Sequence, residues 1–215
     1  VRHYYTLALE EQAVAWSAEE GGDFFQTTEV SVALSWLQII NNPRQDIPLL
    51  AVLRSPAWGF SGDRLAEIRE NQGDFYTALS AAAEQGAEDC AAFLDQLQAL
   101  RFDAGEQSSH KLLLELYRRT GLLEIVSAMP GGEKRRENLL ALYDLAKRFE
   151  GSGHKGLFGF LLHLERVQAS GGLRQKGGGS KGAEGVQILS IHRSKGLEYP
   201  VVFLCGLGRR FNYAD

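Results

Sequence analysis

The sequence predicts a mainly α protein, a helical bundle with a small α/β segment at its ends. Apolar residues recur at helical spacing through most of residues 27–170. A Gly-rich, basic stretch then precedes two short apolar runs of strand length. We therefore divide the chain into an initial segment 1–26, a helical region 27–170, a flexible linker 171–185 and a final segment 186–215.

The first long helix is expected to begin after Thr28 as its N-cap and to end at Pro43. One apolar row on this helix contains Val30 and Leu37, and a second row contains Trp36. A helix that is apolar on two sides is buried on both, so we expect it to lie at the centre of the bundle.

A helix, a turn and a second helix follow. The first of these helices begins at Asp46 and ends before Ser55-Pro56, because a residue before proline disfavours the helical conformation. Trp58 to Phe60 form the turn, and Ser61 caps the next helix, Asp63 to Glu70.

Further helices are expected wherever apolar rows repeat, and their apolar faces indicate a bundle. They are Phe75 to Glu84, Ala87 to Leu100, Ser109 to Thr120, Glu133 to Glu150 and Leu157 to Ala169. A short strand is expected at Ala13 to Trp16, and strands of a buried parallel sheet at Val186 to Ile191 and Val201 to Leu204.

Composition favours a folded protein without a membrane span. The hydrophobic content of 44% is sufficient for a core. The apolar runs are shorter than the roughly 20 residues that cross a bilayer, and no leader opens the chain. Cys90 and Cys205 lack the spacing of a zinc site or a disulfide framework, and we expect Cys90 to be a buried helical thiol.

The formal net charge of −4 predicts only weak binding to nucleic acid by this chain alone, because phosphate contacts require cations. The cations are nevertheless clustered. The clusters are Arg118-Arg119, Lys134 to Arg136, Arg174 to Lys181, Arg193 to Lys195 and Arg209-Arg210.

Residues 190–203, here named the motif segment, carry the most chemistry. They read Ser-Ile-His-Arg-Ser-Lys-Gly-Leu-Glu-Tyr-Pro-Val-Val-Phe. His192 and Ser194 can hydrogen-bond a phosphate, Arg193 adds charge, and Gly196 allows close backbone approach. Glu198 only accepts hydrogen bonds when ionised, so a different contact is expected for it.

The motif segment resembles motif V of the UvrD-type superfamily 1 DNA helicases, with Ser190 and Arg193 departing from the commonest form. The continuation Gly206 to Asn212, and upstream Gly22 to Val30 and Asn42 to Pro56, are similar to the AddA family of helicase and nuclease subunits. By this resemblance, 27–170 is a 2B-type insertion, and 1–26 and 186–215 are parts of the 2A motor domain.

The resemblance also implies roles for single residues. His192, Arg193 and Ser194 would contact single-stranded DNA, whereas Gly196 and Glu198 would contact the nucleotide and couple it to DNA. For Lys195 we prefer an ion pair with a motor carboxylate over contact with a DNA or nucleotide phosphate. The alternative for the whole segment is a strand-turn-strand core without such a function.

In related helicases the helix-turn-helix elements of the 2B insertion touch duplex DNA. Arg54, Ser55 and Trp58 occupy this turn here, where backbone amides and a helix N-terminus could hold a phosphate. The alternative is a purely structural turn in which Trp58 and Phe60 pack inward.

The sequence contains no Gly-x-x-x-x-Gly-Lys-(Ser/Thr) phosphate loop and no nuclease carboxylate cluster, and Val1 is not an initiator Met. We therefore expect an internal piece of an ATP-dependent DNA helicase and exonuclease that acts in double-strand break repair by homologous recombination. By itself it should be inactive and bind no cofactor.

The resemblance implies ATP and Mg²⁺ as cofactors of the whole protein, AddB as its partner, DNA single strands and duplex ends as substrates, and the bacterial cytosol and nucleoid as its location. Two alternatives stay open. One is a non-catalytic helical module that contacts AddB, and the other is a UvrD-type helicase without the nuclease.

Overall fold

The structure is a computed structural model that describes residues 5, 8, 9, 11–18, 24–70, 73–169, 185–189 and 191–205. The chain forms two compact units, one comprising Val1–Gly21 with Gln175–Asp215 and the other Gly22–Arg174. The first is called here the end unit and the second the helical unit. Of the stretch assigned to the linker, only Gly185 lies within the described residues.

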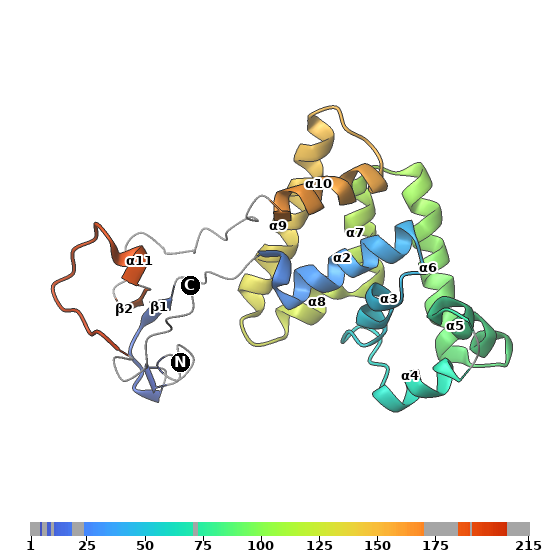
Figure 1. The fold of residues 1–215 in the computed structure, drawn as a ribbon, viewed down its shortest axis with the longest axis horizontal. Helices are drawn as coiled ribbons and strands as arrows, with labels where there is room; N and C mark the ends of the chain where they lie inside the picture. Colours follow the sequence, from blue (N-terminus) through green and yellow to red (C-terminus); the bar gives the residue numbers. More distant parts are fainter. Residues whose placement is uncertain are drawn as a thin grey trace, which may run out of the picture. The chain divides into compact units, whose positions relative to one another are not determined.

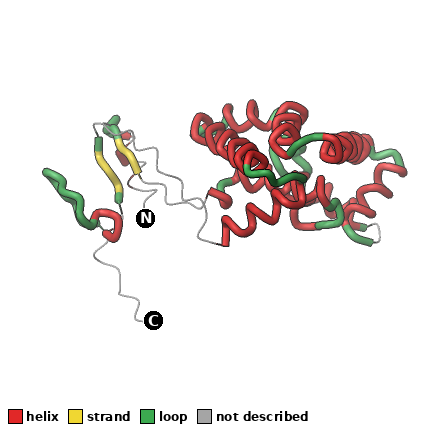
Figure 2. The backbone as a smooth tube through the Cα atoms, turned by 90° about the horizontal axis from the view of Figure 1, so that it is seen from above, coloured by secondary structure: helices red, strands yellow, loops and turns green. Residues whose placement is uncertain are grey.

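The helical unit confirms the expected mainly α fold (Figures 1 and 2). A short 3₁₀ turn, η1 (Phe24–Gln26), precedes the α-helices. They are α2 (Thr28–Asn41), α3 (Asp46–Leu53), α4 (Gly62–Arg69), α5 (Phe75–Glu84), α6 (Glu88–Glu106), α7 (Ser109–Thr120), α8 (Leu122–Ser127), α9 (Gly132–Gly151) and α10 (Leu157–Ala169).

Helix α2 is the central helix, as its two apolar rows predicted (Figure 1). It packs against α3, α6, α9 and α10. Val30 and Leu37 on one row and Trp36 on the other are fully buried. The removal of both rows from water supplies much of the hydrophobic free energy of this unit.

The first residues of α2 and α4 each lie one position before those expected. Thr28 is the first helical residue of α2 and Thr27 takes the N-cap position, where its hydroxyl donates to the Phe24 carbonyl at 2.9 Å. Ser61 caps α4 as expected, because its Oγ accepts from the Arg64 amide at 3.1 Å.

Two helical features were not expected from the sequence. Helix α6 continues six residues beyond Leu100, and Arg101 at that point donates to the Ile40 carbonyl at 3.0 Å at the C-terminal end of α2. Helix α8 follows Gly121, which adopts a left-handed conformation with φ +62°. Tertiary contacts and a glycine turn therefore extend the helical content beyond the periodic pattern.

The end unit contains a parallel pair of strands. Strand β1 (Trp16–Ala18) pairs with β2 (Val186–Ile188), and Trp16 lies opposite Val186. The initial strand therefore starts at the last residue of the expected range Ala13 to Trp16. Only the first three residues of the expected strand Val186 to Ile191 form β2, and helix α11 (Ile191–Ser194) follows.

The expected strand Val201 to Leu204 is not formed. These residues are in irregular backbone and are exposed, Phe203 to 83%. A strand requires a neighbouring backbone to pair with, and no strand of the described residues lies beside this run. The apolar pattern alone cannot distinguish a paired strand from an extended run without a partner.

Candidate nucleic-acid interface

The motif segment begins just after the exit of strand β2 and then turns sharply. Its first helical turn is α11, and the Leu197 amide donates to the Ser194 carbonyl at 3.0 Å to close the following turn. Gly196 has a φ of +83°, and a Cβ there would meet nothing within 4 Å. The backbone at Gly196 is thus in a conformation that favours glycine, with open space beside it.

Two polar side chains of the motif segment donate hydrogen bonds to other groups of the end unit. The Ser194 hydroxyl donates to the Ile191 carbonyl at 2.9 Å, and the Tyr199 hydroxyl donates to Gln187 Oε1 at 2.9 Å. The Ser194 proton is therefore engaged in α11, which leaves its oxygen as an acceptor only. Contact between Ser194 and a phosphate would require this bond to break.

The charged residues at the end of this turn are exposed. Lys195 and Glu198 form no ion pair within the described residues, so the expected pairing of Lys195 with a carboxylate has no counterpart there. His192 and Arg193 lie in α11, and their side chains are outside the part that the structure describes, as is Ser190.

The second expected site is the loop from Arg54 to Ser61, named here the Trp58 turn. Trp58 is half-buried, and its ring lies edge-on to Phe93 with centroids 5.1 Å apart. Phe60 is buried. Inward packing of both aromatic rings, which is the structural alternative for this turn, is therefore present.

The amides of the Trp58 turn are used internally. The Trp58 and Gly59 amides both donate to the Ser55 carbonyl, at 3.0 and 2.8 Å, and the Phe60 amide donates to the Leu53 carbonyl at 3.0 Å. Ser55 is 3% exposed, so its side chain is not presented to a ligand. In this conformation the Trp58, Gly59 and Phe60 amides are engaged within the turn, and the Ser55 hydroxyl is buried without a hydrogen-bond partner among the described residues, so none of them is presented to a phosphate.

Arg54 is the exposed cation of the Trp58 turn. It makes no ion pair within the described residues, and its Nη1 lies 3.5 Å from the position of a Cβ on Gly62, at the start of α4. Its guanidinium therefore remains available to an anion. Of the three residues expected here, Arg54 is exposed, Ser55 is buried and Trp58 packs inward.

Several cation clusters of the sequence are neutralised by carboxylates. Arg119 pairs with Asp103 at 2.8 Å, and Arg135 pairs with Glu29 at 2.7 Å. Among the described residues from 24 to 169, the exposed or half-exposed cations for which no hydrogen bond or ion pair is found are few. They are Arg54, Lys111, Arg136, Lys147, Lys155 and Arg166.

The titratable groups with shifted pKa values are structural in character. The Arg64 hydrogen bonds lower the pKa of Asp89 to about 2, and those from Arg118 and Arg119 lower the pKa of Glu115 to about 2. Burial raises the pKa of Tyr117 far above its usual range, and its hydroxyl donates to the Leu139 carbonyl at 3.0 Å. The Asp89 and Tyr117 bonds join two helices each, whereas the Glu115 bonds lie within α7, and none of the three groups lines the pocket between α9 and α10.

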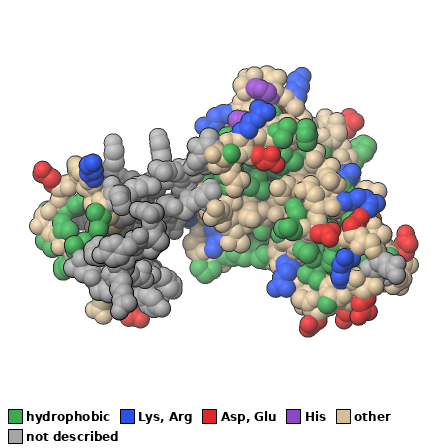
Figure 3. Space-filling view, viewed as in Figure 1, with side chains coloured by type: hydrophobic (Ala, Val, Ile, Leu, Met, Phe, Trp, Pro, Cys, Tyr) green, Lys and Arg blue, Asp and Glu red, His purple; other side chains and the backbone are tan. Residues whose placement is uncertain are grey.

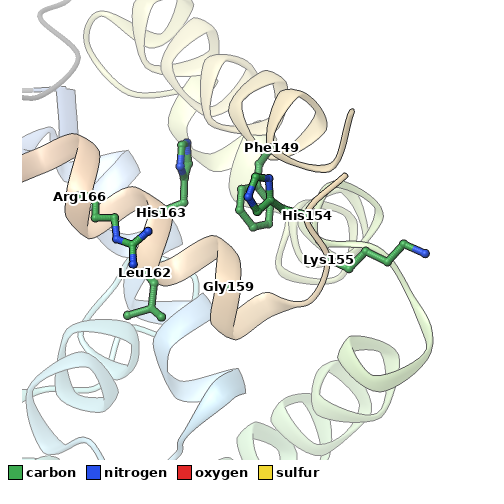
Figure 4. A pocket seen from close by; sticks show the side chains of 7 residues that line it. All are labelled: Phe149, His154, Lys155, Gly159, Leu162, His163 and Arg166. Carbon is green, nitrogen blue, oxygen red and sulfur yellow. The ribbon is translucent and has the colours of Figure 1, made fainter. Parts of the chain in front are cut away.

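A pocket that the sequence did not reveal lies between the end of α9 and helix α10 (Figure 4). Its lining includes Phe149, His154, His163 and Arg166. Nothing in its sequence position distinguishes His163 from the other residues of its helix. The only signal in the sequence was a His, a Lys and an Arg placed around a Leu-rich helix, which is common on solvated helix faces.

Comparison with known proteins identifies relatives along nearly the whole chain. The UvrD-like helicase C-terminal domain model matches residues 5–211. Three proteins that bear the name of an ATP-dependent helicase/nuclease subunit show 46% identity over 92% of the chain in Acetivibrio thermocellus, 44% over 94% in Heliobacterium modesticaldum and 42% over 96% in Geobacillus kaustophilus. The chain spans 16–18% of the length of these curated relatives.

Proposed function

We propose, from the premise that this chain belongs to the UvrD-like helicase C-terminal domain family, that it is part of an ATP-dependent DNA helicase and nuclease subunit. The names of the relatives support this assignment, and at 41–46% identity the first eight of them are close. The proposed role is the processing of broken duplex ends in recombinational repair.

The observation that carries the proposal is the pairing of β1 with β2, two strands that the helical unit separates in the sequence. The two strands are parallel neighbours although α2 to α10 lie between them in the chain. This is the arrangement of a helical insertion in an α/β motor domain. We accordingly assign 27–170 as the 2B-type insertion, 171–185 as its linker, and 1–26 and 186–215 as parts of the 2A motor domain.

The motif segment is the proposed coupling element. His192, Arg193 and Ser194 would contact single-stranded DNA, and Gly196 and Glu198 would contact ATP. The open space at Gly196 and the exposed, unpaired carboxylate of Glu198 suit a ligand at this turn. When bound, ATP supplies the free energy of phosphoanhydride hydrolysis.

The described residues contain no cluster of metal-ligating side chains. No group of three or more His, Cys, Asp or Glu side chains among them is arranged to hold a metal ion. Glu198 is a single exposed carboxylate, and one carboxylate is a weak Mg²⁺ site unless phosphates and water complete the octahedron.

The proposed contact with duplex DNA is Arg54, held in place by the Trp58 turn. Its guanidinium is exposed and unpaired within the described residues, and Trp58 packs on Phe93 beneath the turn. A phosphate contact by one arginine positions the duplex but carries no sequence information. Base specificity is not part of this proposal.

The proposed partner of the whole protein is AddB, and the proposed location is the bacterial cytosol. No helix of the described residues is long and apolar enough to cross a membrane. The alternative of a helical module for protein contact is favoured by two exposed apolar side chains, Ile47 at 83% and Phe102 at 73%. The alternative of a helicase without nuclease predicts that the longer polypeptide has no carboxylate and lysine nuclease cluster.

DNA binding by this chain tests the proposal. The measurement is the fluorescence anisotropy of a labelled duplex with a single-stranded tail, as a function of salt. We expect weak, salt-dependent binding that Arg54→Gln reduces about three- to tenfold, with a salt slope smaller by about 1. The matched control is Arg136→Gln, which removes an equally exposed and unpaired cation from α9.

The DNA-contact and protein-contact functions predict different results in this binding measurement. Equal binding by the Arg54→Gln and Arg136→Gln variants would exclude the Trp58 turn as a duplex contact. Absence of binding at low salt would favour the protein-contact alternative, and the proposed partner AddB should then shift this chain in size-exclusion chromatography.

A second test addresses coupling in the longer polypeptide. We expect Glu198→Gln to lower DNA-stimulated ATP hydrolysis by at least tenfold while DNA affinity changes less than twofold, since an ionised carboxylate can accept hydrogen bonds from the ribose hydroxyls of the nucleotide but not from the phosphates of DNA. A Glu165→Gln variant, which alters an exposed glutamate of α10, is the control. A fall in DNA affinity with unchanged hydrolysis would remove Glu198 from the nucleotide contact.

A further inference from the structure

The pocket between α9 and α10, named here the His154 pocket, has a volume of about 200 Å³. The Phe149 ring forms one side, and the His154 ring stacks on it with centroids 5.1 Å apart and planes 24° from parallel. The His163 ring lies 5.2 Å from Phe149. Figure 4 shows the two imidazoles on either side of the space above Gly159 and α10.

Gly159 keeps the space open. A Cβ at this position would lie 3.4 Å from Phe149 Cζ, at the limit of ordinary contact. A side chain at position 159 would therefore occupy part of this space while contacting the Phe149 ring at an ordinary van der Waals distance.

The electrostatics of the His154 pocket favour an anion. Arg166 and Lys155 also line it, and neither makes an ion pair within the described residues. No carboxylate is among the described residues that line it. Lys155 extends away from Phe149 in Figure 4, so its amine does not point toward the two imidazoles and contributes only its charge.

The neighbouring carboxylates do not neutralise these cations. Glu150, next to Phe149 in the chain, accepts from the Ser109 amide and pairs with His110. Glu165 is exposed and does not line the pocket. Figure 3 shows histidine and cationic side chains gathered on the surface where α9 and α10 meet.

The size of the pocket limits the ligand. Sites for cofactors and drug-sized molecules are usually about 300–1,000 Å³, so a cavity of this volume is too small for a whole nucleotide. It is much larger than the roughly 10–15 Å³ that one water needs. A single phosphodiester group, whose two non-bridging oxygens carry the negative charge and accept hydrogen bonds, fits within this volume and suits the donors of His, Lys and Arg.

We propose that the His154 pocket binds a backbone phosphate of DNA, at a site separate in sequence and structure from the Trp58 turn. The identity of the phosphate as DNA rests on the proposed function. Arg166 and Lys155 supply charge, and the imidazoles of His154 and His163 supply N–H donors from either side of Phe149. Such a contact holds the strand by its backbone without reading its sequence.

The experiment combines binding with NMR of the whole chain. The Cε1–Hε1 signals of His154 and His163, assigned with His→Gln variants, are followed during titration with a duplex bearing a single-stranded tail. Inorganic phosphate is titrated separately. In parallel, Arg166→Gln and Lys155→Gln are compared with Arg136→Gln in fluorescence anisotropy. Circular dichroism at 222 nm checks that these exposed substitutions leave the helices folded.

The expected result is a shift of both imidazole signals on addition of DNA. Each of the two pocket variants should bind DNA about three- to tenfold more weakly than the wild type, with a salt slope smaller by about 1, whereas Arg136→Gln should not. Inorganic phosphate should shift the same signals at much higher concentration, since one phosphate brings no other contact.

The results that overturn the proposal differ from those that overturn the proposed function. If DNA binds but the two imidazole signals stay in place and the pocket variants bind like the wild type, the pocket is rejected while the DNA role of the chain stands. If DNA does not bind at low salt but inorganic phosphate shifts the signals, DNA is rejected as the source of the phosphate and as a ligand of this chain.

Discussion

Arg135 of α9 donates from Nη1 to Glu29 Oε2 of α2 at 2.7 Å, across 106 residues of sequence. The Glu29 side chain is only 3% exposed, and Asn138 donates to its other oxygen at 2.6 Å. Glu29 also stands in the first turn of α2, where the helix dipole favours a negative charge. Three favourable contacts thus compensate the burial of one carboxylate.

Removal of Arg135 should destabilise the helical unit more than removal of its neighbour. We expect Arg135→Gln to lower the free energy of unfolding by about 2–4 kcal/mol, because it leaves a buried carboxylate with one partner fewer. Arg136→Gln should change it by less than about 0.5 kcal/mol, since Arg136 is exposed. Urea unfolding followed by circular dichroism measures both. Equal losses would mean that Glu29 is stabilised by Asn138 and the helix dipole alone.

Two adjacent glycines at the start of α9, Gly131 as its N-cap and Gly132 as its first residue, should differ in their tolerance of alanine. A Cβ on Gly132 would lie 2.0 Å from the Ser127 carbonyl oxygen, so Gly132→Ala must move the backbone and should cost about 3 kcal/mol or more. Gly131 has a φ of +71° but open space, so Gly131→Ala should cost only about 1–2 kcal/mol. Thermal unfolding of the two variants tests the order, and a larger loss at Gly131 would contradict it.

Asp89 should make stability depend on pH below about pH 4. The Arg64 guanidinium donates to its two oxygens at 2.9 and 2.8 Å, and these bonds hold the Asp89 pKa at about 2, below the roughly 3.9 of an unfolded aspartate. The folded state therefore binds fewer protons. The contribution of ionised Asp89 to the free energy of unfolding is present above about pH 4 and is lost as the pH falls toward 2.

Asp89→Asn should therefore flatten the decline of stability between about pH 4 and pH 2, measured as the urea midpoint. Asp95→Asn on the same helix is the control, because Asp95 is exposed and has no ion pair among the described residues. Parallel curves for the wild type and the Asp89 variant would show that the Arg64 bonds do not persist in solution.

The two thiols should react at very different rates. Cys90 is fully buried, and burial raises the pKa of its thiol to about 11, so roughly one molecule in a thousand carries the thiolate at pH 8. Cys205 is exposed. A thiol reagent should label one cysteine in the native protein, Cys205→Ser should abolish that labelling, and urea should expose the second. Fast native labelling of the Cys205 variant would show that α6 opens at Cys90.

The sequence was sufficient for the features that depend on neighbours in the chain. Three helices, α5, α7 and α10, have the limits expected from their apolar rows, because side chains three and four residues apart meet on one helix face. Ser61 as the cap of α4 is equally local, since its hydroxyl reaches an amide three residues away. The resemblance in the motif segment likewise needed only a contiguous run, and it led to the family.

Only the tertiary structure decided which distant groups meet. The pairing of β1 with β2, the Glu29–Arg135 bond and the approach of Phe149 to His163 depend on how whole helices and strands pack, and no local spacing encodes that. The tertiary structure also decided which side chains are exposed to a ligand. The sequence placed Ser55 and Arg54 side by side as phosphate contacts, but in the folded turn the Ser55 side chain is buried and the Arg54 side chain is exposed, because neighbouring residues of a turn point in different directions.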